Sequence, residues 1–234
     1  MSKFAPAVER WRSLVVASAP RFLVDFVLSI IQNESYGRPG IAAKRTTKLK
    51  RALPVKGGGQ MIVKRALGLM QTIPAVIQDY NAQAEHEPAY WDDMTGTTPT
   101  AAQKQIDVGI WTLQNNISAV EKLTGKQLSQ GGKLDLDLMR LALVAYAWGI
   151  GRLKKKLREL EESGKAPTFK NLAAAWPELG KPANRPLYYA NKIVNRMVGK
   201  PTKPGGKPSN GGTAGNIALF ALGGLLLWQL AAKL

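Results

Sequence analysis

Glu34 is the residue of this chain best placed for acid–base chemistry. An apolar stripe at helical spacing precedes it: Leu23, Phe26, Val27, Ile30 and Ile31. Glu34 continues the same face, so its carboxyl is predicted at the edge of the core, at the negative end of the helix dipole. We expect partial burial and the dipole to raise the pKa of Glu34, as a general acid at neutral pH requires. The alternative is a carboxylate that turns back to solvent.

The helix that must position Glu34 is predicted over residues 20–34. Pro20 suits the first helical position, because its missing N–H has no helical partner there in any case. Gly37, Pro39 and Gly40 follow Glu34 and are typical of the end of a helix. The sequence therefore places the carboxyl at the helix C-terminus.

The composition narrows the classes of function. The chain has 234 residues, of which 45% are hydrophobic, enough for one domain with a sizeable core. It contains no cysteine, which excludes disulfides and thiolate nucleophiles, and its one histidine, His86, cannot form a histidine metal cluster. We therefore expect neither a metal nor a cofactor. The net charge of +17 favours nucleic acid, anionic lipid or cell wall as partner, but no specific nucleic-acid motif accompanies it.

Helical periodicity predicts a mainly α fold. Helices are expected over residues 6–18, 101–123, 134–149, 152–162 and 187–198, and residues 61–82 are expected to be helical around a Gly-Leu-Met-Gln turn. The helix at 134–149 is apolar almost all round, so it should be central. A basic loop or small hairpin is expected at 41–60, turns at 85–99, and a loop at 169–186, and no period-2 strand pattern competes.

The composition changes after residue 198. Residues 199–215 are almost entirely Gly, Pro, Lys, Ser, Thr and Asn, which predicts a flexible linker. Residues 217–232 are apolar except for Gln229, and such a helix would be roughly 24 Å long, close to the ~30 Å hydrocarbon core of a bilayer. We predict a transmembrane anchor over 216–234 that contacts lipid through 216–232; the alternative is a buried core helix.

Four blocks of sequence, taken in order, resemble the soluble lytic transglycosylase family. They are Glu34-Ser35, Ala66 to Pro74 with Gly68-Leu69-Met70-Gln71 inside it, Gln105 to Gly109 with Leu113, and Ala145-Tyr146-Ala147-Trp148-Gly149. The stretch from Tyr189 to Val194 is similar to the closing helix of the family. The resemblance implies a goose-type lysozyme-like α fold. The expected domains are an N-terminal helix at 1–19, a catalytic domain at 20–198, the linker at 199–215 and the anchor at 216–234.

The resemblance also implies roles for five residues. Glu34 would be the lone catalytic acid and base, and Ser35 would help to orient the substrate. Met70 and Gln71 would line the sugar cleft. Tyr146 would hydrogen-bond the catalytic carboxyl, which agrees with the need of a phenol on an apolar helix for a polar partner.

The chain departs from the pattern of the family at three points. The segment between Glu34 and Gly68, with its basic stretch at 41–60, is longer than is usual in the family. The Ser-x-x-Gly-Ala sequence that leads into the second block is reduced to Lys64-Arg65-Ala66. The asparagine of the family's Ala-Tyr-Asn-Ala-Gly block is replaced at Ala147.

The resulting functional hypothesis is a peptidoglycan lytic transglycosylase. It would cleave the β-1,4 bond between N-acetylmuramic acid (MurNAc) and N-acetylglucosamine (GlcNAc) in glycan strands and leave 1,6-anhydroMurNAc ends. Charged residues stand where a secretory signal would be apolar: Glu9, Arg10 and Arg12. Together with the predicted anchor, this indicates a membrane-anchored bacteriophage virion protein that opens the host wall during genome delivery or release, with other virion proteins as partners.

Two alternatives remain open from the sequence. The first is a lysozyme-type hydrolase on the same fold, in which Asp92 or Asp93 would be the nearest candidates for a second carboxylate. The second is a basic, membrane-anchored structural protein of the virion without enzymatic activity.

Overall fold

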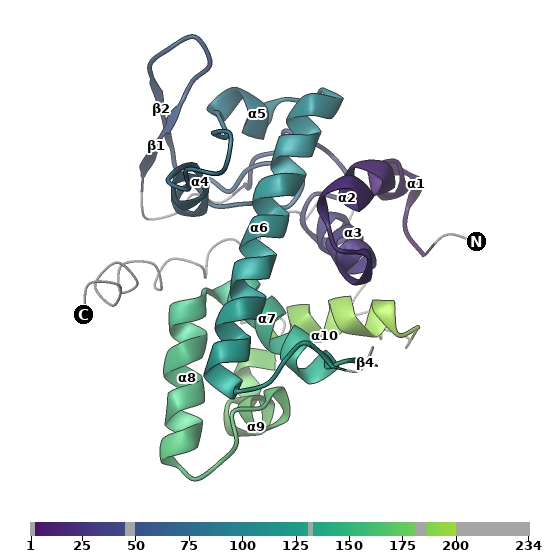
Figure 1. Ribbon diagram of the computed structural model, residues 1–234, viewed down its shortest axis with the longest axis vertical. Coiled ribbons are helices and arrows are strands. Elements are labelled where there is room, and N and C mark those ends of the chain that lie inside the picture. The colour runs from purple at the N-terminus through teal and green to yellow at the C-terminus, as the bar shows by residue number, and fades with distance from the viewer. Residues whose placement is uncertain (1–2, 45–49, 131–132, 181–185, 200–234) are drawn as a thin grey trace. The chain divides into compact units, whose positions relative to one another are not determined.

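The computed structural model describes residues 3–44, 50–130, 133–180 and 186–199 (Figure 1). The described chain is mainly helical, which confirms the predicted fold class. The described residues divide into two compact units: unit 1 comprises those up to Trp111 together with Arg196–Gly199, and unit 2 comprises those of Thr112–Asn195. The division falls within the long helix α6 (Pro99–Thr124).

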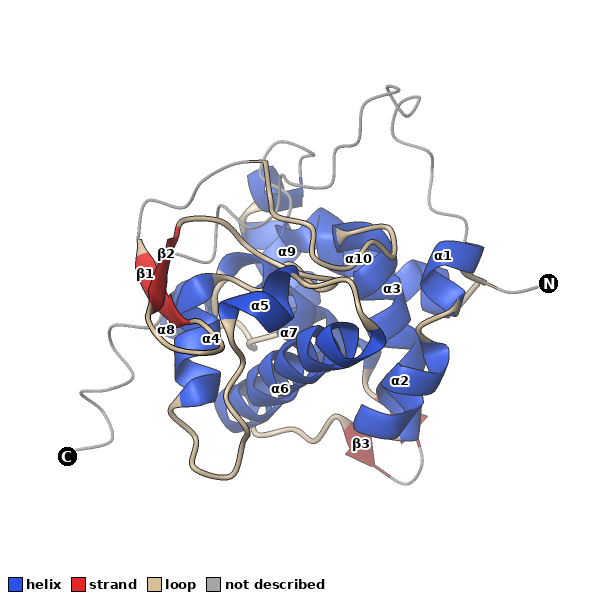
Figure 2. Cartoon of the chain, turned by 90° about the horizontal axis from the view of Figure 1, so that it is seen from above, coloured by secondary structure: helices blue, strands red, loops and turns tan. Residues whose placement is uncertain are grey.

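Unit 1 contains the N-terminal helices and the inserted hairpin. Its elements are α1 (Pro6–Glu9), α2 (Arg12–Ser18), the 3-10 turn η1 (Arg21–Leu23), α3 (Val24–Glu34), β1 (Arg51–Pro54), β2 (Gln60–Val63), α4 (Pro74–Asn81), α5 (Trp91–Thr95) and the first part of α6. Helix α3 packs against α1 and α2, and β1 packs against α4 (Figure 2). Unit 1 therefore holds Glu34 and the Gly-Leu-Met-Gln block.

Helix α3 forms as the apolar stripe predicts. Its inward positions are fully or nearly fully buried, while Pro20 precedes a 3-10 turn rather than opening the α-helix itself. Ser29, the one buried polar residue before Glu34, accepts a hydrogen bond on its Oγ from Arg196, at 2.9 Å. This bond fixes the middle of α3 from the C-terminal end of α10 (Pro186–Met197), inside unit 1.

The segment after Glu34 contains an antiparallel hairpin. Its register pairs Arg51 with Val63 and Pro54 with Gln60. Leu53 and Val63 are buried in an apolar cluster with residues of α4, α5 and α6. The expectation of a loop or hairpin is confirmed, although the paired strands end at Val63 rather than at residue 60.

The turn predicted at Gly-Leu-Met-Gln within residues 61–82 is confirmed, but the helix predicted before it is wrong. Residues 61–63 belong to β2, the chain then turns, and α4 begins only at Pro74. The physical reason is the backbone: Gly68 and Gln71 adopt φ of +77° and +50°, which an α-helix cannot contain. The apolar residues of this block therefore fill the core from a turn.

Unit 2 is built from the predicted central and charged helices. It contains the end of α6, the short strands β3 (Ser129–Gln130) and β4 (Lys133–Leu134), α7 (Leu136–Trp148), α8 (Ile150–Glu162), α9 (Phe169–Ala175), the 3-10 turn η2 (Pro177–Gly180) and most of α10. Asp135 begins α7 by accepting the N–H groups of Asp137 and Leu138. The apolar face of α7 is buried, as its sequence predicts.

The short helices α5 and α9 lie in segments predicted as turns and loop. Thr168 caps α9 by accepting the N–H of Asn171, and the carboxylate of Asp137 accepts the N–H of Phe169. Such helices depend on caps and tertiary contacts more than on periodicity, which five to seven residues cannot display.

Among the helices of the described chain, none has both the length and the apolar character that crossing a bilayer requires. The predicted linker beyond residue 199 and the predicted anchor at 216–234 lie outside the described residues.

Candidate active site

Glu34 is the last residue of α3, and only 5% of it is exposed. Both the helix-end position and the burial agree with the sequence prediction. Ser35 follows as a fully buried residue: its Oγ donates to the carbonyl of Ile31 at 3.1 Å and accepts from the N–H of Gly37 at 3.2 Å. These bonds close the helix and start a turn, while the substrate role of Ser35 stays a prediction.

The turn after Glu34 is fixed by the N-terminal helices. Gly37 has a φ of +77°, and its carbonyl accepts hydrogen bonds from Trp11 Nε1 at 2.9 Å and from Arg10 Nη2 at 3.0 Å. A Cβ at Gly37 would lie 2.1 Å from the carbonyl oxygen of Ala7. The N-terminal segment, expected as a separate helix, therefore helps to position the turn that follows Glu34.

The Gly-Leu-Met-Gln block forms a closed turn beside the segment that follows Glu34. Leu67 and Thr72 exchange both backbone hydrogen bonds, at 3.0 and 2.9 Å. The N–H of Gly68 donates to the carbonyl of Ile41 at 2.9 Å, and the N–H of Ala43 donates to that of Ala66 at 2.8 Å. The Gly-Leu-Met-Gln block is thus joined by backbone hydrogen bonds to residues 41–43, which follow the turn after Glu34.

Met70 and Gln71 are both buried in this turn, in different ways. Met70 is fully buried against α6, where a Cβ on Gly109 would lie 2.2 Å from its Sδ. Gln71 Nε2 donates to the carbonyls of Ile41 and Gly68, at 3.0 and 2.9 Å. Its Oε1 is buried and accepts no hydrogen bond from the described part of the chain. The Oε1 atom of Gln71 can therefore accept a further hydrogen bond. Contact of Met70 with substrate stays a prediction.

Gln105, which begins the third resembling block and has no role predicted from the sequence, joins the segments around the turn. It is fully buried on α6, and its Oε1 accepts from the N–H groups of Leu69 at 2.9 Å and Gly40 at 3.3 Å. Its Nε2 donates to the carbonyls of Asp93 and Gly96, at 2.8 and 2.9 Å. One side chain thus binds three loops. A polar residue on the buried stripe of a helix is the signal that could have identified it.

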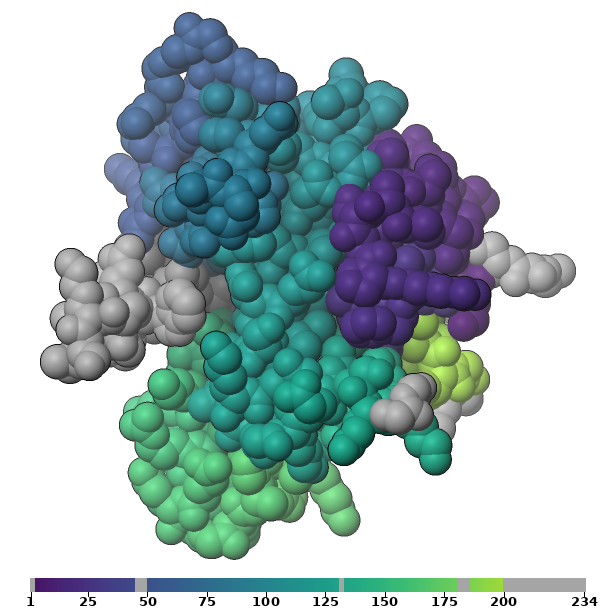
Figure 3. Space-filling model, viewed as in Figure 1, coloured from purple at the N-terminus to yellow at the C-terminus, as the bar shows by residue number. Residues whose placement is uncertain are grey.

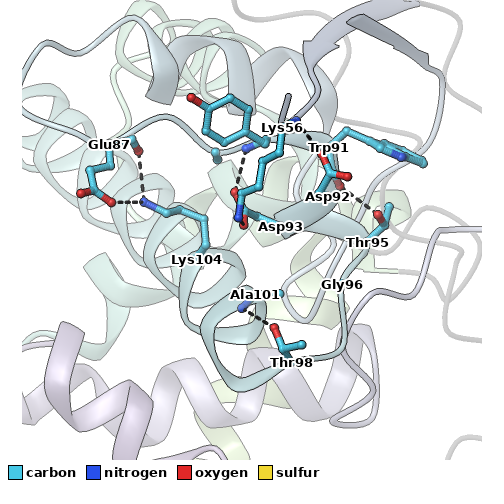
Figure 4. Close-up of polar contacts among 12 residues, drawn as sticks. Lys56, Glu87, Trp91, Asp92, Asp93, Thr95, Gly96, Thr98, Ala101 and Lys104 are labelled. Atoms are coloured by element: carbon cyan, nitrogen blue, oxygen red, sulfur yellow. Dashed lines mark hydrogen bonds and ion pairs between the residues drawn. The ribbon is translucent and has the colours of Figure 1, made fainter. Parts of the chain in front are cut away.

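The two carboxylates of α5 are committed to the hairpin (Figure 4). Asp92 accepts the N–H of Lys56 at 2.8 Å, and the buried Asp93 accepts from Lys56 Nζ and from the N–H of Tyr90. The hydrogen bond to Asp93 raises the pKa of Lys56. These contacts give both acidic residues a structural role.

His86 belongs to an aromatic cluster. Its ring stacks on Tyr80 with centroids 4.5 Å apart and meets the edge of Trp111 at 6.4 Å. No group of three metal-ligating side chains occurs over the residues that the structure describes.

Tyr146 lies on α7 in unit 2 and is half-buried. Ala147, which replaces the asparagine expected from the family pattern, is buried, and Gly149 ends the helix with a φ of +93°. Because Glu34 and Tyr146 belong to different units, the hydrogen bond between them stays a prediction.

The chain matches the family model of the transglycosylase SLT domain over residues 15–169. This match covers more than half of the chain, so the protein belongs to that family. It includes Glu34, the turn at residues 68–71 and Tyr146. Membership supports peptidoglycan cleavage of the lytic transglycosylase type, with peptidoglycan as the substrate. Comparisons with curated proteins and with solved structures found no match.

Proposed function

We propose that the protein cleaves the β-1,4 bond between MurNAc and GlcNAc and leaves 1,6-anhydroMurNAc ends. Glu34 is the single acid and base of this reaction. Three features support the assignment: the buried position of Glu34 at the end of α3, the braced turn that follows it, and the adjoining turn at residues 68–71.

The observation that carries the proposal is the distribution of carboxylates around Glu34. Glycosidases that hydrolyse their substrate generally use two carboxylates, about 5 Å or about 6.5–9.5 Å apart. The sequence contains no acidic residue between Glu34 and Asp79, Asp25 on the same helix pairs with Arg12, and the two acids of α5 bind Lys56. These existing partners favour a reaction in which the one carboxyl of Glu34 acts twice.

The reaction balances with one carboxyl. The protonated Glu34 donates its proton to the glycosidic oxygen as the bond from C1 of MurNAc to that oxygen breaks, and GlcNAc leaves with a free hydroxyl. The ionised Glu34 then accepts the proton of the MurNAc C6 hydroxyl, whose oxygen bonds to C1. Glu34 regains its proton and no water is consumed. Since the attacking hydroxyl belongs to the same sugar, proximity lowers the barrier.

Gln71 is the binding residue that the geometry favours most. Two backbone carbonyls hold its amide nitrogen, so its buried Oε1 is the group left to accept a hydrogen bond from a sugar hydroxyl or acetamido N–H. Ser35, Met70 and Tyr146 complete the proposed set, Tyr146 as the hydrogen-bond partner of the catalytic carboxyl.

The setting that we propose is a bacteriophage particle whose protein is held to a membrane by residues 216–232. The support is compositional: an apolar stretch follows a linker that carries Lys200, Lys203 and Lys207. Such a protein would open the host wall locally during genome delivery or release, in contact with other virion proteins.

The test is digestion of purified sacculi by the wild type and by Glu34→Gln, with mass analysis of the released muropeptides. We expect anhydro-muropeptides from the wild type and a loss of at least about a thousandfold in rate for Glu34→Gln. Asp25→Asn is the matched control, because Asp25 lies in the first turn of the same helix and pairs with Arg12 and Lys3 at the surface. It should retain activity.

The products separate the proposal from its alternatives. Muropeptides with reducing ends, one water heavier, would select hydrolysis and require a second carboxylate. Intact sacculi after incubation with folded wild-type protein would select the non-enzymatic structural protein.

A further inference from the structure

The inserted segment carries a charge pattern that catalysis does not explain. Between Glu34 and Asp79 the sequence contains no acidic residue but nine basic ones: Arg38, Lys44, Arg45, Lys48, Lys50, Arg51, Lys56, Lys64 and Arg65. Most of them lie in the β1–β2 hairpin or within a few residues of its ends. A surface of this kind attracts anions.

The hairpin also exposes aliphatic side chains beside these cations. Opposite residues of an antiparallel pair share a face, so Ala52 and Ile62 lie on the face opposite to the buried Leu53. Ile62 is 58% exposed on this outer face, and Met61, which pairs with Leu53 on the other face, is 42% exposed. Ile62 and Met61 therefore expose apolar surface along β2, one on each face of the hairpin, which indicates an interaction surface more strongly than an isolated residue does.

The hairpin is held from two sides, so its outer face is presented in a fixed orientation. Leu53 and Val63 anchor one face in the core of unit 1, and β1 packs on α4. At the other end, the backbone and side chain of Lys56 bind Asp92 and Asp93 (Figure 4). In the space-filling view the blue residues of the hairpin form an exposed edge of unit 1 (Figure 3).

We propose that the β1–β2 hairpin docks on the surface of an anionic lipid bilayer. Ile62 and Met61 enter the boundary between headgroups and acyl chains, and the exposed Lys50, Lys64 and Arg65 bind lipid phosphates. An acidic wall polymer or nucleic acid would use the same cations but would gain little from Ile62, so the exposed aliphatic pair favours lipid. This inference does not depend on the catalytic role of Glu34.

The absence of cysteine allows a local test in the full chain. A polarity-sensitive fluorophore is attached at Gln60→Cys, on the outer face of β2, and in a second sample at Gln127→Cys, an exposed residue after α6. Each protein is mixed with phosphatidylglycerol-containing vesicles, with neutral phosphatidylcholine vesicles, and with vesicles of brominated lipid. Fluorescence at residue 60 then reports insertion of the hairpin itself, even if another segment of the chain also binds the vesicles.

We expect a blue shift and bromine quenching at residue 60 with anionic vesicles, and no response at residue 127. The double variant Met61→Ser/Ile62→Ser should lose the quenching, whereas Val16→Ser, which changes an exposed aliphatic residue of α2, should keep it. Lys50→Gln/Lys64→Gln should raise the concentration of anionic lipid needed for half of the response at least tenfold. The reason is that each cation near an anionic bilayer strengthens binding about fivefold.

Three results would overturn the proposal. One is vesicle binding by the chain with no change at residue 60. Another is an equal response with neutral and anionic vesicles. The third is a protein that gives no response with vesicles but binds heparin, used as a polyanion, equally well with and without Met61→Ser/Ile62→Ser. The hairpin would then be a surface that binds polyanions rather than lipid.

Discussion

Two glycine turns of unit 1 have nearly the same backbone and opposite surroundings. Gly37, three residues after Glu34, has a φ of +77°, and Gly57, at the tip of the hairpin, has a φ of +85°. A Cβ on Gly37 would collide with the carbonyl oxygen of Ala7, whereas a Cβ on Gly57 would meet no atom within 4 Å. The first turn is enclosed by the N-terminal helices, and the second is open.

The contrast separates two uses of the same backbone conformation. At Gly37, close approach of two chain segments holds the turn that follows α3, so the geometry of this turn is fixed by packing. At the hairpin tip, the glycines only reverse the chain, and the position of the hairpin is fixed elsewhere, by Leu53, Val63 and Lys56. Substitutions should therefore act on catalysis in the first region and on local order in the second.

The largest effect is expected for Gly37→Ala. The positive φ alone costs about 1–2 kcal/mol for an L-residue, and the collision with the Ala7 carbonyl must in addition displace α1 or the turn. We expect a loss of about 3–4 kcal/mol in the free energy of unfolding, measured in urea, and a large fall in kcat on sacculi. Gly57→Ala is the matched control and should lose only about 1–2 kcal/mol, with unchanged kcat. Equal losses would show that the enclosure of Gly37 is unimportant.

Gln105→Leu should have the next largest effect. Leucine fills a similar volume but leaves the N–H groups of Leu69 and Gly40 and the carbonyls of Asp93 and Gly96 without their partner. A buried unsatisfied polar group costs about 1–3 kcal/mol. Because the surrounding chain can relax, we expect Gln105→Leu to lower the free energy of unfolding by about 3 kcal/mol in all. The value is checked by denaturant unfolding, with kcat measured on the folded fraction.

Gln103→Leu, on the same helix, is the control for Gln105→Leu. Gln103 is half-buried, and Ser18 and Asp107 are among the groups its amide contacts, which can rearrange or reach solvent. Gln103→Leu should lower the free energy of unfolding by about 1 kcal/mol and leave kcat unchanged. A comparable fall in kcat for both variants would argue against a special role of Gln105 in positioning the turn at residues 68–71.

The sequence predicts what depends on regular periodicity. The stripe ending at Glu34 gives α3 and the burial of its carboxyl, and the apolar run before Trp148 gives α7. It predicts the turn at Gly68 to Gln71 but fails just before it, where a helix is expected and the structure has β2 leading into backbone φ values that no helix contains. Backbone angles of this kind are decided by contacts distant in sequence, such as the one between Gly68 and Ile41.

Only those parts of the candidate site that have a local sequence pattern can be predicted from the sequence. Glu34 and the turn at residues 68–71 have local signatures, whereas Gln105 and Lys56 act through hydrogen-bond partners 9 to 65 residues away. No spacing rule specifies a long-range hydrogen bond to a backbone carbonyl. The structural use of Asp92 and Asp93, which the sequence offered as catalytic candidates, became visible only through the fold of the hairpin.

In the hairpin region, Asp93→Ala should lower the stability less than Gln105→Leu does, and only locally. The Asp93 carboxylate caps α5 at Tyr90 and binds Lys56, and loss of such a cap costs about 1 kcal/mol. We expect faster hydrogen exchange in β1 and β2 with little change in kcat. Asp92→Ala, which removes a single exposed hydrogen bond to the Lys56 N–H, should change exchange less. A fall in kcat with unchanged exchange would instead make Asp93 part of the catalytic site.

The smallest effect is expected for Asp79→Asn, at the base of the hairpin. Burial raises the pKa of Asp79 to about 6 from 3.8, against the opposing charge of Arg51. The folded state therefore binds the proton more tightly than the unfolded state, so the wild type loses stability as the pH rises from about 4 to about 6. Asparagine cannot ionise, so Asp79→Asn should be more stable than the wild type above pH 6 by about 1 kcal/mol, after allowance for the half-exposed site. The difference should vanish below pH 4. Urea unfolding at pH 4 and pH 7.5 measures it, and a pH-independent difference would show that ionisation of Asp79 does not strain the hairpin side of unit 1.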